Sequence, residues 1–474
     1  MSERETTGAE TAVPGHGPEP QAVGAAPWRG RLALAAGSTT ALVTASLLGS
    51  ALGFVNKAAC RGGDWNIYLK QFQAHCYTDI YPLYFGEQLS AGKVPYTQHP
   101  VEYPVLIGGA MQAVAWLVRP ISDPYIRGRE FFDATVVLLA LFAVAGTLAT
   151  AYLAGRSRRW TALLVALAPG LILASFINWD LIAMGLVALG MAAWAARRLV
   201  LAGVLLGLAV ATKFYPLVFF GPLLLLCLRA GRLRAFAVTA ASAAAAWLAV
   251  NLPVAIAAPA GWERFYQLSA TRAADWGSIW YYFETERWPV VDVLGIGSLN
   301  EYSLALFLAG CAGIGVIILA APRRPRLPQV FFLVLAVFLL ANKVWSPQYV
   351  IWLVPLVVLA RPRLWSYALW QVAEVGYFFA IWAYLISLLV AGPVPALDGG
   401  IGPGLYFTAL LARFGTVALL CVLVVRDILR PEADVVRAAG EDDPAGGLLD
   451  GAADRFVLRL RPRPAFRRLA GDTG

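Results

Sequence analysis

Long apolar stretches follow one another along most of the chain, separated by short polar connectors. They begin near Leu32 and end near Arg426, and their lengths suit helices of the ~20 apolar residues that cross a bilayer. The pattern predicts an all-α, polytopic integral membrane protein with about twelve transmembrane helices over residues 28–426. Residues 56–102 and 259–301 are long and polar enough to form loops outside the bilayer.

Basic residues indicate which connectors face the cytoplasm. Five short connectors carry 13 Arg and no acid: residues 156–159, 197–198, 229–234, 323–326 and 361–363. The two long loops instead carry four basic and four acidic residues, and three basic and six acidic residues. Because Lys and Arg in short loops mark the cytoplasmic side, we expect both long loops on the outer face and both termini in the cytoplasm.

The segment Tyr103–Val118 breaks this alternation. It has 16 residues, carries Pro104 near its start and contains Gly108-Gly109. If it crossed the membrane, every later Arg-rich connector would lie outside. We therefore predict a helix that enters the outer leaflet without crossing, which is tolerated where backbone lines a cavity. No internal repeat is evident, and this disfavours a transporter built from inverted halves.

Composition supports the membrane interpretation and describes the chain's ends. Hydrophobic residues make up 59% and charged residues 14%, with a mean hydropathy of +0.64, so little charge remains for several water-soluble domains. Residues 1–27 are expected to be a disordered cytoplasmic N-terminus without a cleaved signal peptide. Residues 427–474 are expected to be a largely disordered cytoplasmic tail. Its basic part, and the net charge of +9, favour contact with anionic membrane lipid over nucleic acid.

Two of the five cysteines are candidates for a disulfide. Cys60 and Cys76 share the first outer loop, where a bridge can persist. Closing a loop of ~15 residues contributes about 3 kcal/mol in the chain-entropy model; two free thiols are the alternative. Cys227, Cys311 and Cys421 lie in apolar stretches and are expected to be small packing residues.

Asp79 is the residue of the first outer loop best placed for acid–base chemistry. The loop combines acids, aromatic residues and turn residues just before Tyr103–Val118. A carboxylate at that boundary is partly desolvated, which raises its basicity and suits it to take a proton from a sugar hydroxyl. The alternative is that Asp79 caps the short helix that follows it.

Four polar segments, all on the expected outer face, form an ordered pattern over roughly residues 60–360. The first has an Asp with a nearby Tyr, a Gly-x-x-Pro-Tyr and a Tyr-Pro pair that opens an apolar helix: Asp79, Tyr84, Gly92, Pro95, Tyr96, Tyr103 and Pro104. The later three are Asn178–Ala183, Ala211–Pro216 and Ser346–Pro355. Together they resemble the family 87 glycosyltransferases. Val105 departs from the family's usual second proline, and Pro347-Gln348-Tyr349 stands where some members carry a histidine.

The resemblance implies a GT-C fold and a polyprenyl-phosphate sugar, typically mannose-bearing, as the donor. Asp79 would then be the catalytic base. Lys213 is a lone cation on the outer side, where the charge rule disfavours it, so we expect it to pair with the donor phosphate rather than to snorkel. Lys343 and Arg272 are further candidates for that contact. The expected substrate-binding residues are Tyr84, Tyr96, Glu102, Tyr103, Asn178, Asp180, Tyr215 and Gln348. For Asp180, a helix cap is the alternative.

The sequence therefore predicts an inverting hexosyltransferase of the plasma membrane, with its active site on the outer face. Its partners would be membrane lipid, the lipid-linked sugar and a glycolipid or glycan acceptor. No Walker A or Rossmann glycine pattern and no metal-ligand cluster is evident, while a divalent ion held by Asp79 and the phosphate stays open. The rival is a flippase or transporter of lipid-linked sugars, which would bind with the same residues but need no base. It would also want ionisable residues in mid-helix, and Glu374 is nearly alone there.

Overall fold

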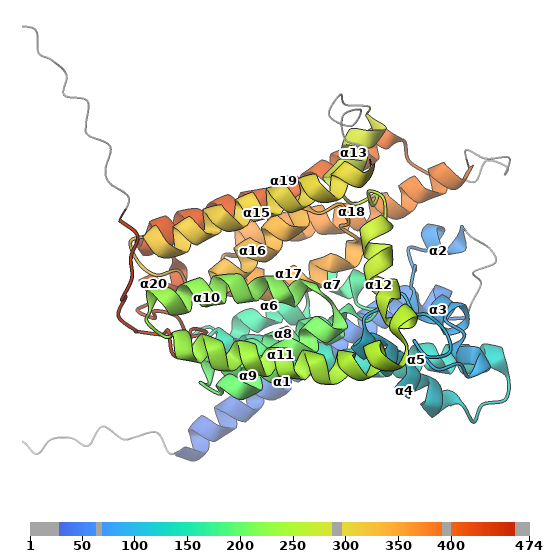
Figure 1. Ribbon diagram of the computed structural model, residues 1–474, viewed down its shortest axis with the longest axis horizontal. Coiled ribbons are helices and arrows are strands. Elements are labelled where there is room, and N and C mark those ends of the chain that lie inside the picture. Colours follow the sequence, from blue (N-terminus) through green and yellow to red (C-terminus); the bar gives the residue numbers. More distant parts are fainter. Residues whose placement is uncertain (1–27, 63–68, 287–295, 391–399, 460–474) are drawn as a thin grey trace, which may run out of the picture. The chain divides into compact units, whose positions relative to one another are not determined.

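The computed structural model describes residues 28–62, 69–286, 296–390 and 400–459. Two compact units result, residues 1–40 and residues 41–474, and the boundary falls within helix α1 (Trp28–Lys57). The second unit is a bundle of helices (Figure 1). Its described residues contain no β-strand, only an isolated bridge between Pro95 and His99. The predicted all-α membrane fold is confirmed.

Six helical segments of the described chain are long and apolar enough to cross a membrane. The first joins the later part of α1 to the short η1 (Ala58–Cys60). The others lie in α5 (Pro124–Leu153), α11 (Leu233–Ala257), α15 (Ile296–Ala320), α18 (Leu364–Val390) and α19 (Pro403–Leu429). Each contains a stretch of 18 apolar-rich residues with no more than two charged ones, as a spanning helix requires.

Shorter apolar helices pack among these long ones. They are α4 (Val105–Val118), η4 (Arg159–Ala162) with α6 (Leu163–Ala166), α7 (Pro169–Ala174), α8 (Asp180–Ala195), α9 (Leu199–Thr212), η5 (Tyr215–Phe219) with α10 (Phe220–Arg229), α16 (Leu327–Ala341), and η6 (Pro347–Tyr349) with α17 (Val350–Ala360). Residues of α16 and α17 are buried on nearly every face, as helices that are hydrophobic all round should be. The predicted twelve crossings are the six long segments, the α6–α7 pair and the five short helices after it. Their count in a bilayer stays a prediction.

Helix α4 is the segment predicted to enter the membrane without crossing it. Its 14 residues give a length of about 21 Å at 1.5 Å per residue, shorter than the ~30 Å hydrocarbon core. Pro104 precedes its first turn in an extended conformation. Helix α9, which is counted among the crossings, has the same length, so the non-crossing position of α4 stays a prediction from the Arg-rich connectors.

The two long polar loops contain more helix than the sequence predicts. The first holds α2 (Lys70–Gln73), α3 (Ile80–Gly86) and η3 (Leu89–Ala91), and Cys60 and Cys76 form the candidate disulfide with Cα atoms 5.6 Å apart. The second holds α12 (Pro259–Thr271) and α13 (Ile279–Thr285), and α15 already begins at Ile296. The outer loop predicted over residues 259–301 therefore contains two helices and the start of α15, and its place outside the bilayer stays a prediction.

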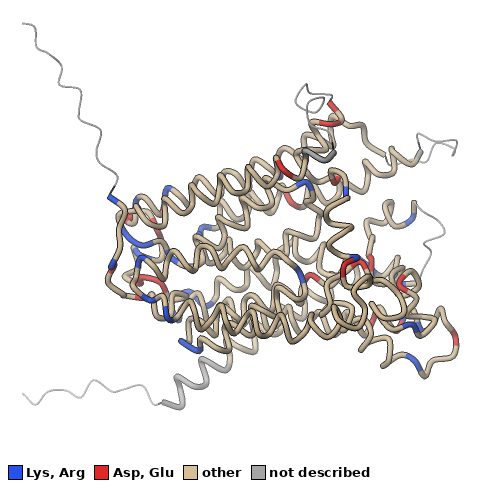
Figure 2. Tube along the Cα trace, viewed as in Figure 1, with Lys and Arg blue, Asp and Glu red and all other residues tan. Residues whose placement is uncertain are grey.

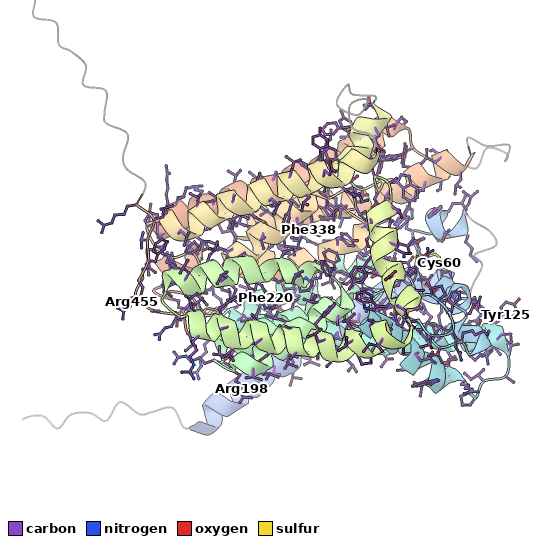
Figure 3. All side chains as sticks on the ribbon, viewed as in Figure 1. Cys60, Tyr125, Arg198, Phe220, Phe338 and Arg455 are labelled. Atoms are coloured by element: carbon purple, nitrogen blue, oxygen red, sulfur yellow. A yellow bond between two sulfur atoms is a disulfide. The ribbon has the colours of Figure 1, made fainter. Side chains whose placement is uncertain are left out.

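Charges separate towards the two ends of the second unit. Figure 2 shows Lys and Arg gathered at the end where the short connectors lie, and Figure 3 labels Arg198 and Arg455 towards that end, with Cys60 and Tyr125 towards the opposite one. This separation agrees with the orientation predicted from the Arg-rich connectors.

The described part of the C-terminal tail is folded rather than disordered. Residues 431–459 pass through η7 (Pro431–Ala433) and α20 (Val435–Ala438) and pack on the Arg-rich end of the bundle. Asp434 accepts a hydrogen bond from Arg326 Nε at 2.7 Å, and Asp454 accepts one from Arg229 Nη2 at 2.7 Å. The tail's acids thus find buried Arg partners, which composition alone does not show. Residues 1–27 and 460–474, also predicted to be disordered, lie outside the described residues.

Candidate active site

Asp79 lies where the first long polar loop, residues 56–102, meets the turn before α8. The hydroxyl of Thr78 donates to the carbonyl oxygen of Phe176 at 2.7 Å, and the N–H of Asp79 donates to that of Ile177 at 2.6 Å. Thr78 is fully buried, so the first of these bonds is shielded from water. Together they fix Asp79 beside the Asn178–Asp180 segment, far away in the sequence.

The carboxylate of Asp79 is held by two tyrosines. Its Oδ1 accepts a hydrogen bond from the hydroxyl of Tyr77 at 2.6 Å, and its Oδ2 accepts one from the hydroxyl of Tyr103 at 3.3 Å. It makes no capping bond to α3, although it stands at the N-cap position. The side chain of Asp79 therefore does not cap α3, which was the alternative to a catalytic role.

The surroundings of Asp79 change its basicity. Burial raises the pKa of Asp79, because desolvation disfavours the charged carboxylate. The hydrogen bond from Tyr77, the charge of Lys213 and the hydrogen bond from Tyr103 oppose this rise in pKa, while the charge of Asp180 adds to it. With its pKa raised, the carboxylate binds a proton more readily than an exposed one does, and it stays in reach of solvent because the residue is only partly buried.

Asp180 and Lys213 form an ion pair next to Asp79. Asp180 opens α8 and is completely buried, and its Oδ1 lies 3.0 Å from Lys213 Nζ. Lys213 follows α9 in extended conformation, and its Nζ lies 4.8 Å from the centre of the Tyr103 ring. Tyr103 therefore contacts both Asp79 and Lys213. Asn178 Oδ1 accepts from the N–H of Asp180 at 3.1 Å, so Asn178 orders the start of α8.

Lys57 and Tyr77 belong to this group, although the sequence singled out neither. Lys57 ends α1 with no exposed surface, and its Nζ has no hydrogen-bond partner among the described residues. It lies 5.2 Å from the ring centre of Phe378, and its charge interacts with Asp79. Tyr77 stacks on Trp382 with ring centres 4.8 Å apart. The sequence feature that could have pointed to Tyr77 is its place two residues before Asp79. For Lys57, that feature is a lysine at the end of an apolar run.

The two other cations predicted to bind phosphate have different surroundings. Arg272 keeps 55% of its side chain exposed, and its Nη2 lies 3.5 Å from Asp275 Oδ1. Lys343 is buried, and its Nζ donates to the carbonyl oxygens of Ala270 at 3.0 Å and Arg272 at 2.5 Å. These contacts hold the end of α12, so they favour a structural role for Lys343 over the predicted contact with phosphate. Arg272 remains accessible.

A stack of aromatic rings joins the third and fourth matched segments. Tyr215 lies face to face with Trp352 at 4.2 Å between ring centres, and Trp352 lies on Tyr349 at 3.8 Å. Gln348 is buried in η6 beside Tyr349. The stack joins the segments Ala211–Pro216 and Ser346–Pro355. The charge of Asp180 interacts with Tyr215 and with Tyr349.

The remaining predicted residues lie further from Asp79. The hydroxyl of Tyr96 donates to the carbonyl oxygens of Tyr103 at 2.9 Å and Pro104 at 2.8 Å, so Tyr96 positions Tyr103. A Cβ on Gly261 would come within 2.2 Å of the Tyr96 carbonyl oxygen, so α12 can approach only through a glycine. Tyr84 packs on Phe131 and is almost fully buried, and its contact with substrate stays a prediction. Glu102 is exposed on the rim of a cleft between α3 and α12.

No group of three or more His, Cys, Asp or Glu among the described residues could hold a metal ion. The charged groups around Asp79 instead form a network of two acids and two lysines with tyrosine donors. Such a network can accept a proton at Asp79 and present positive charge to an anion close by.

Comparison with protein-family models gives a match to glycosyltransferase family 87 over residues 115–347. The match supports the predicted resemblance to this family. The match includes Asp180 and Lys213 but begins after Asp79 and Tyr103, so it supports the family and not the role of those two residues. A search of curated proteins finds no match. The match to family 87 and the apolar helices together support a membrane glycosyltransferase rather than the transporter alternative.

Proposed function

We propose that this glycosyltransferase moves a hexose, with mannose as the expected sugar, from a polyprenyl phosphate to an acceptor hydroxyl on the outer face of the plasma membrane. The observation that carries the proposal is the position of Asp79. Its carboxylate is held by Tyr77 and Tyr103 at the membrane boundary, and the Lys213–Asp180 pair adjoins it. A base and a cation side by side suit a reaction in which a hydroxyl is deprotonated while a phosphate departs.

The reaction would be a single displacement. The acceptor oxygen forms a bond to the anomeric carbon, its proton passes to Asp79, and the bond from that carbon to the phosphate oxygen breaks. The electron pair leaves with the polyprenyl phosphate, and the anomeric centre inverts, so a β-linked donor gives an α-linked product. No nucleotide is needed, since the lipid phosphate is the leaving group.

Lys213 is the residue we assign to the departing phosphate. Its Nζ already lies between Asp180 Oδ1 and the Tyr103 ring, so both neighbours hold the ammonium group in place. A preorganised cation stabilises charge as it develops on a leaving group. The exposed guanidinium of Arg272 is the second candidate for this contact. Were a divalent ion to take part, Asp79 would be the residue to hold it, and the ion would neutralise charge on the phosphate.

The charge distribution supports the proposed orientation of the site. The Arg-rich connectors mark the cytoplasmic end, and Asp79 lies in the loop closed by the Cys60–Cys76 disulfide. Disulfides persist in oxidising compartments, so this bridge supports an outer-face location for the loop. Both termini would then be cytoplasmic.

The experiment that tests the donor uses the purified protein in lipid vesicles with radiolabelled polyprenyl-phosphate mannose and, separately, a nucleotide-linked mannose. Transfer from the polyprenyl donor to a glycolipid acceptor, and none from the nucleotide sugar, is the expected result. Transfer from the nucleotide sugar alone would overturn the proposal. Polyprenyl-phosphate glucose serves as the comparison that tests the sugar.

A further inference from the structure

A cleft separate from the Asp79 group opens at the outer end of the second unit. It lies between the end of α3, residues 96–102 and the first turns of α12, and its volume is about 620 Å³. Cavities that bind small molecules commonly measure roughly 300–1,000 Å³. The cleft is therefore large enough for a ligand of several rings.

Side chains of opposite charge converge in this cleft. Glu87 is 4% exposed; its Oε1 accepts from the N–H of Glu102 at 3.3 Å, and its Oε2 lies 3.3 Å from His99 Nε2. Glu102 and Arg264 also line the cleft, and the charge of Arg264 interacts with Glu87. Two carboxylates, an imidazole and a guanidinium thus offer both acceptors and donors of hydrogen bonds around one volume.

The walls between these groups are partly apolar. Leu83, Pro100 and the Tyr96 residue contribute to the lining, and Gly261 brings α12 against the backbone of Tyr96. A ligand that suits such walls carries hydroxyls on its edges and apolar C–H groups on its faces. Carbohydrates have this chemistry. An anionic ligand would meet Glu87 and Glu102, and a hydrocarbon chain would leave the charged groups without partners.

The cleft connects to the proposed base through two short paths along the chain. Helix α3 starts directly after Asp79 and ends at Gly86, which lines the cleft. Its seven residues span about 10 Å. Glu102, on the rim, directly precedes Tyr103, whose hydroxyl bonds to Asp79. Two segments that flank the Asp79 group therefore also border the cleft.

We infer that this cleft binds the acceptor, and that the acceptor is a neutral oligosaccharide whose inner sugars occupy the cleft while its terminal hydroxyl reaches Asp79. The inference rests on the proposed function and adds to it the class of acceptor. It implies that the enzyme extends an existing glycan rather than placing a first sugar on a lipid or protein.

Acceptor length provides the test. Neutral mannose oligosaccharides of increasing length are supplied to the full-length protein in vesicles with the polyprenyl donor, and KM is measured for acceptor and donor separately. We expect the acceptor KM to fall as the oligosaccharide lengthens into the cleft. Glu102→Gln and Arg264→Gln should each raise the KM of long acceptors by about tenfold, the effect of one lost hydrogen bond to a charged group. The donor KM and the KM of the shortest acceptor should not change.

Glu263→Gln is the matched control. Glu263 precedes Arg264 on α12, is exposed and does not line the cleft. The KM of the Glu263→Gln variant for the acceptor should therefore equal that of the unmodified protein. Thr97→Trp is a second variant, since the exposed Thr97 lines the cleft and an indole there would obstruct it. It should remove the preference for long acceptors.

Two results would overturn the inference while leaving the proposed function intact. One is transfer without any dependence on acceptor length; the other is length dependence that Glu102→Gln, Arg264→Gln and Thr97→Trp leave unchanged. Should the unmodified protein transfer nothing to any acceptor, the proposed function fails. Saturation-transfer NMR of a mannose tetrasaccharide with the same protein then tests binding in the cleft independently of transfer. A binding signal that is lost in Thr97→Trp supports binding in the cleft, and the absence of a signal with the unmodified protein refutes it.

Discussion

The short hydrogen bond between Tyr77 and Asp79 allows the proposed base to be tested without removing it. Tyr77→Phe keeps the ring that stacks on Trp382 and removes the hydroxyl that lies 2.6 Å from Asp79 Oδ1. A hydrogen bond to a charged group contributes roughly 1.5–3 kcal/mol. Because each 1.36 kcal/mol is a factor of ten, the loss should shift the ratio of carboxylate to carboxylic acid by roughly 10- to 150-fold.

The sign follows from the state that the bond stabilises. Tyr77 donates to the carboxylate and so lowers the pKa of Asp79; removing the hydroxyl lets that pKa rise. A general base acts only when it is deprotonated, so the acidic limb of the pH profile of kcat/KM should move to higher pH. At pH values well above that limb, the rate should change much less.

The assay is the pH dependence of mannosyl transfer by the purified protein in vesicles. Tyr103→Phe is the internal comparison, because its bond to the same carboxylate is longer, 3.3 Å, and should give the smaller displacement. Tyr125→Phe is the control, since Tyr125 is 71% exposed and the structure shows no hydrogen bond between it and Asp79. The reasoning is refuted if Tyr77→Phe leaves the acidic limb in place while lowering the rate equally at all pH values.

Three further perturbations test other parts of the structure. Lys57→Met removes a buried positive charge near Asp79, so the acidic limb of the pH profile should again move to higher pH; an unchanged limb would exclude Lys57 from the site. Burial raises the pKa of Glu87 to about 7 from 4.5, so the folded state holds a proton more tightly than the unfolded state, and the free energy of unfolding should fall by about 3 kcal/mol as pH rises through this range. Glu87→Gln should remove that dependence in denaturation of the detergent-solubilised protein, and a slope that persists would contradict it. Arg413→Met leaves Glu374 buried without its partner at 2.9 Å, which should cost roughly 3–5 kcal/mol of stability, and the added Glu374→Gln should recover part of that loss.

The apolar pattern predicted the fold because membrane helices depend on local composition. A run such as α19 is apolar over a length that suits a bilayer, and no distant contact is needed to recognise it. Lys213 was singled out for a related reason, because it follows an apolar run on the side where the Arg-rich connectors are absent and a cation is unusual there. Asp79 was singled out because its loop combines acids, aromatic residues and turn residues just before Tyr103–Val118.

Other features depend on contacts between distant parts of the chain. Lys343 and Lys213 look alike in the sequence, yet one donates to backbone carbonyls at the end of α12 and the other pairs with Asp180. Only the packed structure distinguishes them. The folding of the tail also depends on distant contacts. An acidic segment by itself suggests exposure to solvent, yet Asp434 is buried against Arg326, 108 residues away. Lys57 lies at a helix end, and its charge interaction with Asp79 could not be predicted from the residues around it.

The most direct test of the central claim is the transfer rate of Asp79→Asn. The substitution keeps the size of the side chain and removes the proton acceptor, so a base contributing the usual ~10²–10⁴-fold should be lost at that magnitude while polyprenyl-phosphate mannose still binds. Asp123→Asn is the matched control, because this exposed cap of α5 retains its hydrogen bonds as an amide. We predict a loss of at least a hundredfold in Asp79→Asn with donor affinity unchanged, and a normal rate in Asp123→Asn. Near-normal transfer by Asp79→Asn would contradict the account.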